Sequence, residues 1–95
     1  MIVVEGFFDC IKVHQAGLPN VVALMGSSLS ENQEQCLCQF KRVILFLDGD
    51  EPGRIATQSI AARLMSQTFV KVVHLANGKQ PDQLSSDEIK TTLSI

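Results

Sequence analysis

Acidic residues directly follow two apolar segments of the chain, and their spacing suits the binding of a divalent metal ion. Asp48 and Asp50 lie behind the apolar run 43–47, and Glu5 and Asp9 lie behind the run 2–4. Side chains on an extended chain alternate with a period of two, so Asp48 and Asp50 should point roughly the same way. Like charges held together repel one another unless a cation lies between them. These residues therefore predict an acidic pocket that holds a metal.

The elements that must position these acids alternate along the chain. The pattern predicts strands at 1–5, 21–25, 43–47 and 70–75, and helices at 7–15, 30–40, 52–64 and 85–93, with a polar loop at 76–84. Ser30 with Gln33, and Ser85 with Glu88, have the spacing of capping boxes that begin two of the helices. This order predicts a compact α/β fold of about four mainly parallel strands with helices on both faces.

The predicted topology brings the acids together. In such sheets, sites form in the crevice beyond the carboxyl ends of the strands. Glu5, Asp48, Asp50 and the loop acid Asp82 all follow strand ends. Carboxylate oxygens suit Mg²⁺ or Mn²⁺, and two such ions could stabilise both the attacking and the leaving oxygen of a phosphodiester.

Glycines and cations near the acids are candidates for binding phosphate. Gly6 and Gly49 leave room beside the acids, and Gly53 would permit close approach to a helix start whose positive end favours an anion. Arg54 could touch a phosphate or be solvated, and Lys79 could reach substrate or remain an ordinary surface side chain. Ser27 could bond substrate or Glu5, or serve only in a turn.

A simpler interpretation of the acids stays open. Asp-Gly pairs after strands are often only turns, and Asp50 or Glu51 could cap the helix that follows.

The composition limits the function. The 95 residues, 45% of them hydrophobic, fit one domain covering 1–95, and the net charge of −2 differs from the basic surface of an autonomous nucleic-acid binder. Any nucleic-acid contact would be metal-mediated or supplied by other domains. An odd number of cysteines, no signal peptide and no long apolar stretch predict a cytoplasmic protein without membrane contact.

Three segments resemble the Toprim domain. They are 3–9 (VVEGFFD), 21–27 (VVALMGS) and 46–53 (FLDGDEPG), and they are most similar to the Toprim domain of bacterial DnaG-type DNA primases and related primase-helicases. The resemblance covers nearly the whole chain and implies the compact, Rossmann-like Toprim fold. It also implies that this chain is a fragment or a relative of a larger primase-like protein.

The resemblance implies a role for each matching acid. Glu5 matches the family's glutamate, held to act as general acid or base or to help bind metal. Asp48 and Asp50 match the metal-binding pair, and Asp9 matches an acid one helical turn beyond the glutamate. The loop 78–82 matches a primase loop that supplies Asp82, although Gln80 stands where that loop usually has an acid, which puts a full-strength second metal site in doubt.

The function that the resemblance implies is Mg²⁺- or Mn²⁺-dependent nucleotidyl transfer. A complete enzyme would synthesise RNA primers on single-stranded DNA, with DNA and nucleotides held through neighbouring domains and a replicative helicase as a further partner. The isolated domain is expected to be inactive. Two alternatives stay open: a small Toprim nuclease that uses water as nucleophile, and a non-catalytic module that binds nucleic acid or a partner protein, with Gln80 an early sign of lost chemistry.

Overall fold

A four-stranded parallel sheet is the centre of the fold in the computed structural model, which describes residues 1–26 and 28–93. The strands are β1 (Ile2–Val4), β2 (Val21–Ala23), β3 (Arg42–Leu45) and β4 (Phe69–Val72), arranged in the order β2-β1-β3-β4. The helices are α1 (Phe7–Gln15), α2 (Glu31–Leu37), α3 (Glu51–Leu64) and α4 (Ser86–Thr92), with one turn of 3-10 helix, η1 (Pro81–Gln83), inside the segment predicted as loop. No helix in this described part of the chain is long and apolar enough to cross a membrane.

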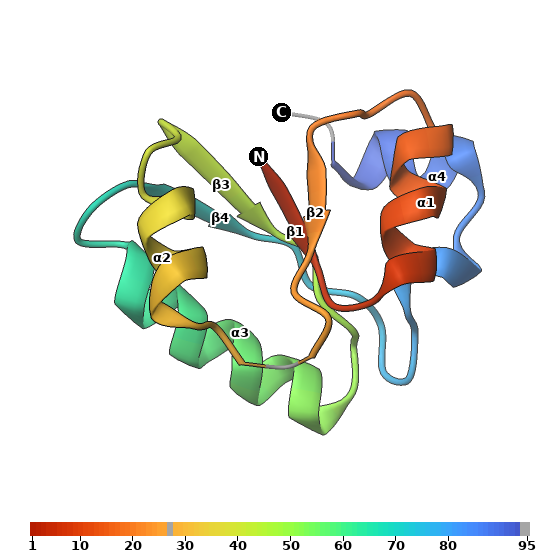
Figure 1. The fold of residues 1–95 in the computed structure, drawn as a ribbon. Helices are drawn as coiled ribbons and strands as arrows, with labels where there is room; N and C mark the ends of the chain where they lie inside the picture. Colours follow the sequence, from red (N-terminus) through yellow and green to blue (C-terminus); the bar gives the residue numbers. More distant parts are fainter. Residues whose placement is uncertain (27, 94–95) are drawn as a thin grey trace.

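Helices cover both faces of the sheet, as the sequence predicts. Figure 1 shows α2 and α3 on one side of the strands and α1 and α4 on the other. The chain leaves β1 through α1 to reach β2 at one edge, and it leaves β3 through α3 to reach β4 at the opposite edge. The carboxyl ends of β1 and β3 therefore flank the point where the strand order reverses, which is where open α/β sheets form their binding crevice.

Both predicted capping boxes are present. The Ser30 hydroxyl accepts a hydrogen bond from the Gln33 amide at 3.1 Å, and the Gln33 side chain accepts one from the Ser30 amide at 2.9 Å. Ser85 and Glu88 form the same pair of bonds at the start of α4. The second helix ends earlier than the predicted residue 40. Its last bonds run from the amides of residues 39 and 40 to carbonyls three residues back, so the chain closes in tighter turns before β3.

The strands are shorter than the apolar runs that predicted them. β3 ends at Leu45, yet Phe46 and Leu47 are as deeply buried as the strand itself, at 0% and 2% exposure. An apolar run indicates which residues are buried, not which residues pair with a neighbouring strand. Burial continues beyond the end of β3 because the chain still passes between two layers of helices.

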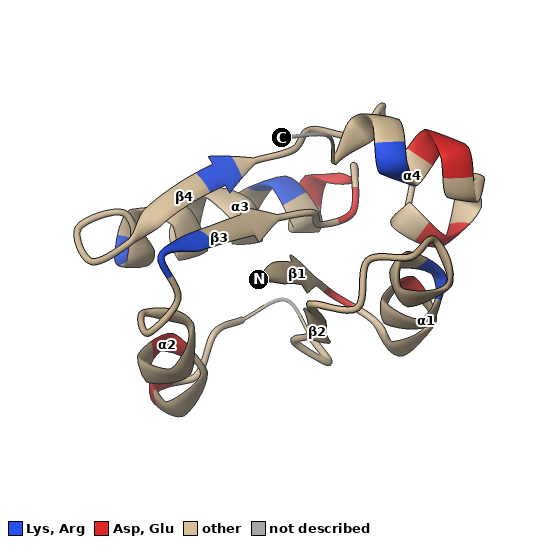
Figure 2. Ribbon diagram, turned by 90° about the horizontal axis from the view of Figure 1, so that it is seen from above, with Lys and Arg blue, Asp and Glu red and all other residues tan. Residues whose placement is uncertain are grey.

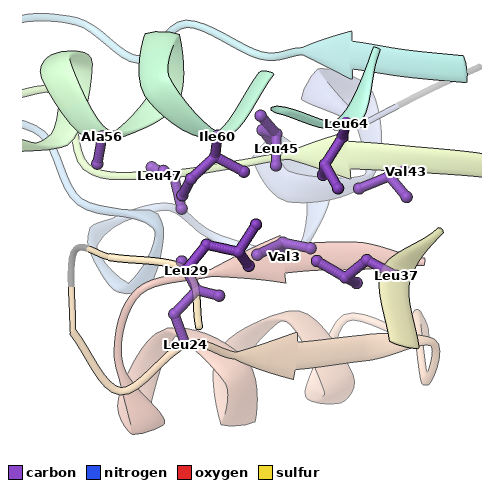
Figure 3. Close-up of a cluster of buried hydrophobic side chains, with 10 residues drawn as sticks. All are labelled: Val3, Leu24, Leu29, Leu37, Val43, Leu45, Leu47, Ala56, Ile60 and Leu64. Atoms are coloured by element: carbon purple, nitrogen blue, oxygen red, sulfur yellow. The ribbon is translucent and has the colours of Figure 1, made fainter. Parts of the chain in front are cut away.

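Alternate residues of the central strands point into two separate apolar layers. The layer beneath α2 and α3, drawn in Figure 3, contains Val3, Leu24, Leu29, Leu37, Val43, Leu45, Leu47, Ala56, Ile60 and Leu64. The other layer, beneath α1 and α4, contains Ile2, Val4, Val13, Ala16, Ile44, Phe46, Ile89 and Leu93. Because β1 and β3 are packed from both sides, the residues that follow them are held in fixed positions.

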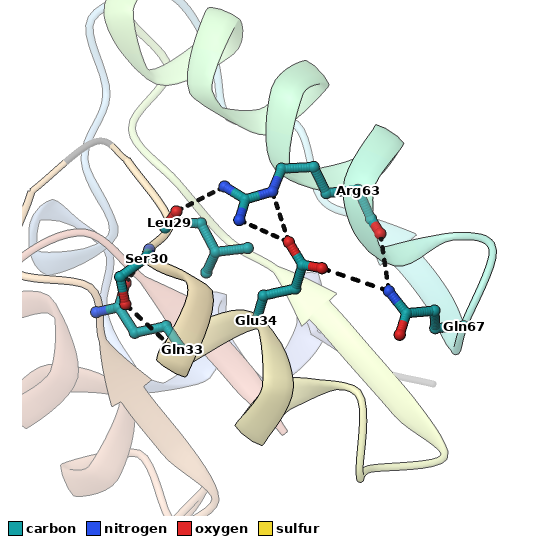
Figure 4. Close-up of polar contacts among 6 residues, drawn as sticks. All are labelled: Leu29, Ser30, Gln33, Glu34, Arg63 and Gln67. Atoms are coloured by element: carbon teal, nitrogen blue, oxygen red, sulfur yellow. Dashed lines mark hydrogen bonds and ion pairs between the residues drawn. The ribbon is translucent and has the colours of Figure 1, made fainter.

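An ion pair joins α2 to α3 on the first of these faces. Arg63 lies 2.6 Å from the Glu34 carboxylate, and a second nitrogen of its guanidinium donates to the Leu29 carbonyl at 2.6 Å (Figure 4). Gln67 extends the network by donating to Glu34 at 3.5 Å. These contacts fix the C-terminal end of α3, the helix that Asp50 of the predicted site caps at its other end.

Candidate metal centre

Three of the predicted acids meet at the carboxyl edge of the sheet. Glu5, Asp48 and Asp50 each place a carboxylate oxygen within 4.8 Å of the others. Figure 2 shows the acidic segments at the end of β1 and at the start of α3 converging on this edge. The parallel pairing of β1 with β3 brings the chain ends together, and the Asp48 backbone amide donates a 2.9 Å hydrogen bond to Glu5 Oε2.

Asp50 belongs to this cluster and also caps a helix. Its Oδ1 accepts a 2.7 Å hydrogen bond from the Gly53 amide at the start of α3. The cap and the metal-ligand interpretations are therefore compatible, because a carboxylate has two oxygens and several lone pairs. The cap fixes the orientation of the side chain within the cluster.

Among the acids of the site, Asp48 has the most strongly raised pKa. Its Oδ1 is buried and has no hydrogen-bond partner within residues 1–26 and 28–93. Burial is the largest cause that raises the pKa of Asp48, to about 7, and repulsion from neighbouring carboxylates, led by Glu5, acts in the same direction. A buried acceptor without a partner is costly. A divalent cation would provide that partner and cancel the repulsion, so the three residues fit a hard metal ion.

Asp9 and Asp82 lie beside the cluster and outside that group of three. Asp9 is only 6% exposed, and its Oδ1 accepts a 3.0 Å hydrogen bond from the backbone amide of Asp82. Burial raises the pKa of Asp9, although the Asp82 amide opposes this shift. In this structure Asp9 holds η1 against α1. A ligand role for either acid stays a prediction.

All these acids except Asp50 line one depression of about 370 Å³. Its walls are formed by Glu5, Gly6, Phe7, Phe8, Asp9, Met25, Gly26, Asp48, Gln80 and Asp82. The acids were predictable from the sequence, whereas a part in the site for Phe7, Phe8 and Met25 was not foreseen. The available signal was the helical phase of the two phenylalanines, which places them off the face of α1 that buries Asp9 and Val13.

Two of the predicted phosphate-binding glycines serve the packing of the chain. A Cβ on Gly49 would lie 2.2 Å from the Ala76 carbonyl oxygen, and one on Gly53 would lie 2.2 Å from the Asp48 carbonyl oxygen. The space expected beside Gly49 for a phosphate is filled at that point by the loop after β4. Gly6 differs, because a Cβ there would meet nothing closer than Asp9 Oδ2, at 3.4 Å.

The predicted cations lie at the margin of the site. Arg54 donates a hydrogen bond to the Asn77 side chain, which ties α3 to the loop after β4. Lys79 is exposed, and its backbone carbonyl accepts a 2.7 Å bond from the Gly49 amide. Ser27 is outside the described residues.

Stability without metal should fall as pH rises from about 4 to about 7. The ordinary pKa of an aspartate, 3.8, applies to Asp48 in the unfolded chain, and folding raises it to about 7. The folded state therefore holds an extra proton in this window and loses it as pH passes 7. Asp9, whose pKa is also raised, acts in the same direction. After allowance for solvent screening, we expect Asp48 to account for about 1–2 kcal/mol.

Urea unfolding in the presence of a chelator, at a series of pH values across this window, measures the effect. Asp48→Asn should remove most of the slope while keeping the shape of the side chain. The difference in slope between the two proteins measures the contribution of Asp48. Other carboxylates, whose pairing produces the opposite slope, are present in both proteins. An unchanged slope in the variant would contradict the assignment.

The parallel sheet and the acidic cluster at its reversal point define an α/β domain with a candidate metal centre. The chain belongs to the Toprim-like family, whose sequence profile matches residues 2–85. This confirms the resemblance seen in the sequence.

DNA primases are among the relatives of this chain. The DNA primase of Clostridium acetobutylicum is 36% identical over 85 residues, which are 87% of this chain and 14% of that protein. The crystal structure of the Aquifex aeolicus primase zinc-binding and RNA polymerase domains has a TM-score of 0.83 at 36% identity, covering 96% of this chain and 24% of that one. A DnaG primase catalytic domain bound to single-stranded DNA has a TM-score of 0.81 at 25% identity, covering 98% of this chain and 32% of that one.

Proposed function

We propose that this chain is the metal-dependent nucleotidyl-transfer domain of a primase-like protein that synthesises RNA primers on single-stranded DNA. The observation that carries the proposal is the buried Oδ1 of Asp48, which has no partner in the described part of the chain, with Glu5 and Asp50 beside it at the reversal point of the sheet. Similarity to primases over nearly the whole chain supports the reaction class. The chain spans 14% of the Clostridium relative, so the complete reaction needs parts that this chain does not provide.

The chain's own residues have distinct roles in this proposal. Asp48, Asp50 and Glu5 would hold Mg²⁺ or Mn²⁺, which when bound stabilises the charge on phosphate oxygens. Glu5 Oε2 is engaged by the Asp48 amide. Glu5 Oε1 could then bind the metal or exchange a proton as a general acid or base. Asp9 keeps η1 in place, and η1 in turn sets the position of Asp82.

Neighbouring domains would supply the main contacts to the template strand and additional contacts to the nucleotides. The chain has a net charge of −2, and phosphate backbones are held mainly by Lys and Arg. We infer that neighbouring domains provide that basic surface. The similar DnaG catalytic domain, of which this chain matches 32%, is bound to single-stranded DNA. A replicative helicase is a further proposed partner of the complete protein.

A chimera tests the proposal. This chain would replace the matching segment of the Aquifex aeolicus primase, whose fold it shares. We expect the chimera to make primers on single-stranded DNA with Mg²⁺ or Mn²⁺, and Glu5→Gln to reduce primer yield at least about tenfold. Glutamine keeps an oxygen for the Asp48 amide, so the change removes the charge and spares the bond.

The control is Glu88→Gln, which makes the same substitution on α4. A folded chimera that binds single-stranded DNA but makes no primers would contradict the proposal. Cleavage of single-stranded DNA by the 95-residue chain alone, lost in Glu5→Gln, would favour the Toprim nuclease alternative.

A further inference from the structure

Two exposed phenylalanine side chains line the acidic depression. Phe7 is 56% and Phe8 is 74% exposed, in the first turn of α1. The helix buries Asp9 and Val13 against the rest of the fold, so the two phenylalanines contribute little to the core. Their ring centroids lie 6.0 Å apart with the planes tilted by 52°. Together they present a broad apolar surface to solvent.

Met25 adds to this surface in an unusual backbone conformation. It has φ of 62°, a region that residues other than glycine rarely adopt, and it is 72% exposed. Its amide donates a 2.8 Å hydrogen bond to the Glu5 carbonyl, which places Met25 directly beside the metal centre. We call Phe7, Phe8 and Met25 the stacking wall.

The depression thus combines two kinds of chemistry. One side carries carboxylates that fit a metal ion and, through it, phosphate. The other side carries apolar and aromatic groups, which fit the flat face of a nucleobase. A nucleotide is a ligand that has both parts in one molecule. A neighbouring domain packed on the stacking wall is the competing occupant, but it would also cover the acids that share the depression.

We propose that the stacking wall binds the base of a nucleotide whose phosphates lie over the acidic cluster. This inference rests on the proposed function, because the acids must hold a metal for the phosphates to bind. The side chains of the wall have no hydrogen-bond donor, so they contribute affinity without selecting among the four bases.

A single tryptophan provides a direct optical test. The chain has no Trp and no Tyr, so Phe8→Trp introduces its one strong fluorophore. With Mg²⁺ present, ATP should quench this fluorescence, whereas inorganic tripolyphosphate should not. Phe69→Trp is the matched control, since Phe69 is 59% exposed at the start of β4, the end of the sheet opposite the acids. We expect no response from it.

Calorimetry on the 95-residue chain completes the test. In the wild type, Mg-ATP should bind roughly tenfold more tightly than Mg-tripolyphosphate, and Phe8→Ala should remove that difference without weakening tripolyphosphate binding. Phe69→Ala should leave both affinities unchanged. Equal affinity for the two ligands, without quenching, would overturn the stacking wall and leave the metal centre intact. If neither ATP nor tripolyphosphate binds in a Mg²⁺-dependent way, the metal centre is overturned as well.

Discussion

Asp48→Asn should lower the affinity of the chain for Mg²⁺ or Mn²⁺ at least about 100-fold. The substitution removes a formal charge from the cluster and replaces one carboxylate oxygen by an amide nitrogen, which does not bind hard cations. The effect should be large because Asp48 is the acid with a buried oxygen that accepts no hydrogen bond from the described residues. Ligands of a divalent ion act together, and Glu5 and Asp50 alone would leave an incomplete set.

Titration followed by amide NMR measures this change. In the wild type, Mg²⁺ should shift the resonances of Glu5, Asp48 and Asp50, and the shifts should disappear in the variant. Asp87→Asn is the control for net charge, because it removes the same charge from the exposed first turn of α4. Without metal, Asp48→Asn should be the more stable protein, so loss of binding cannot be attributed to unfolding. Equal affinity in both proteins would rule out Asp48 as a ligand.

Gly49→Ala should destabilise the fold by roughly 3 kcal/mol, a large part of the stability of a small domain. The added methyl would lie 2.2 Å from the Ala76 carbonyl oxygen and 3.0 Å from that of Leu75. Both obstacles are backbone, so no side chain can rotate away. The loop is also fixed to this turn, because Gly49 donates to the Lys79 carbonyl and accepts from the Gly78 amide at 3.0 Å.

Urea denaturation measures the loss, and Gly26→Ala is its matched control. A Cβ on Gly26 meets no atom within 4 Å among the described residues beyond its chain neighbours, so that variant should stay within about 0.5 kcal/mol of the wild type. A wild-type unfolding midpoint for Gly49→Ala would show that the loop after β4 moves aside freely.

The order of elements was predictable because it depends on local patterns. Apolar runs, the two serine capping boxes and the spacing of Ala56, Ile60 and Leu64 each appear within a short stretch of sequence, and the structure contains all of them. The convergence of Glu5 with Asp48 was predictable from topology, because parallel strands end at one edge. Strand ends were not, since Phe46 and Leu47 are buried without belonging to the ladder.

The finer division of the site depends on contacts between distant parts of the chain. Nothing near Gly49 in the sequence indicates that Ala76 fills the space beside it. Nothing near Asp9 indicates that it accepts a bond from Asp82. The separation of the five acids into a group of three and a supporting pair follows from these long-range contacts, which periodicity does not encode.

The acidic cluster draws its members from both sides of the sheet. Glu5 leads into α1 on one face, and Asp50 begins α3 on the other. A bound ion would link the segment that leads into α1 to the segment that leads into α3. These two segments belong to opposite faces of the sheet, whose apolar layers are separate. Occupancy by the ion would then be linked to folding, adding about 2.7 kcal/mol when the free ion is at about 100 times its dissociation constant. The free energy of unfolding of the domain would then rise with the concentration of the free divalent ion around it.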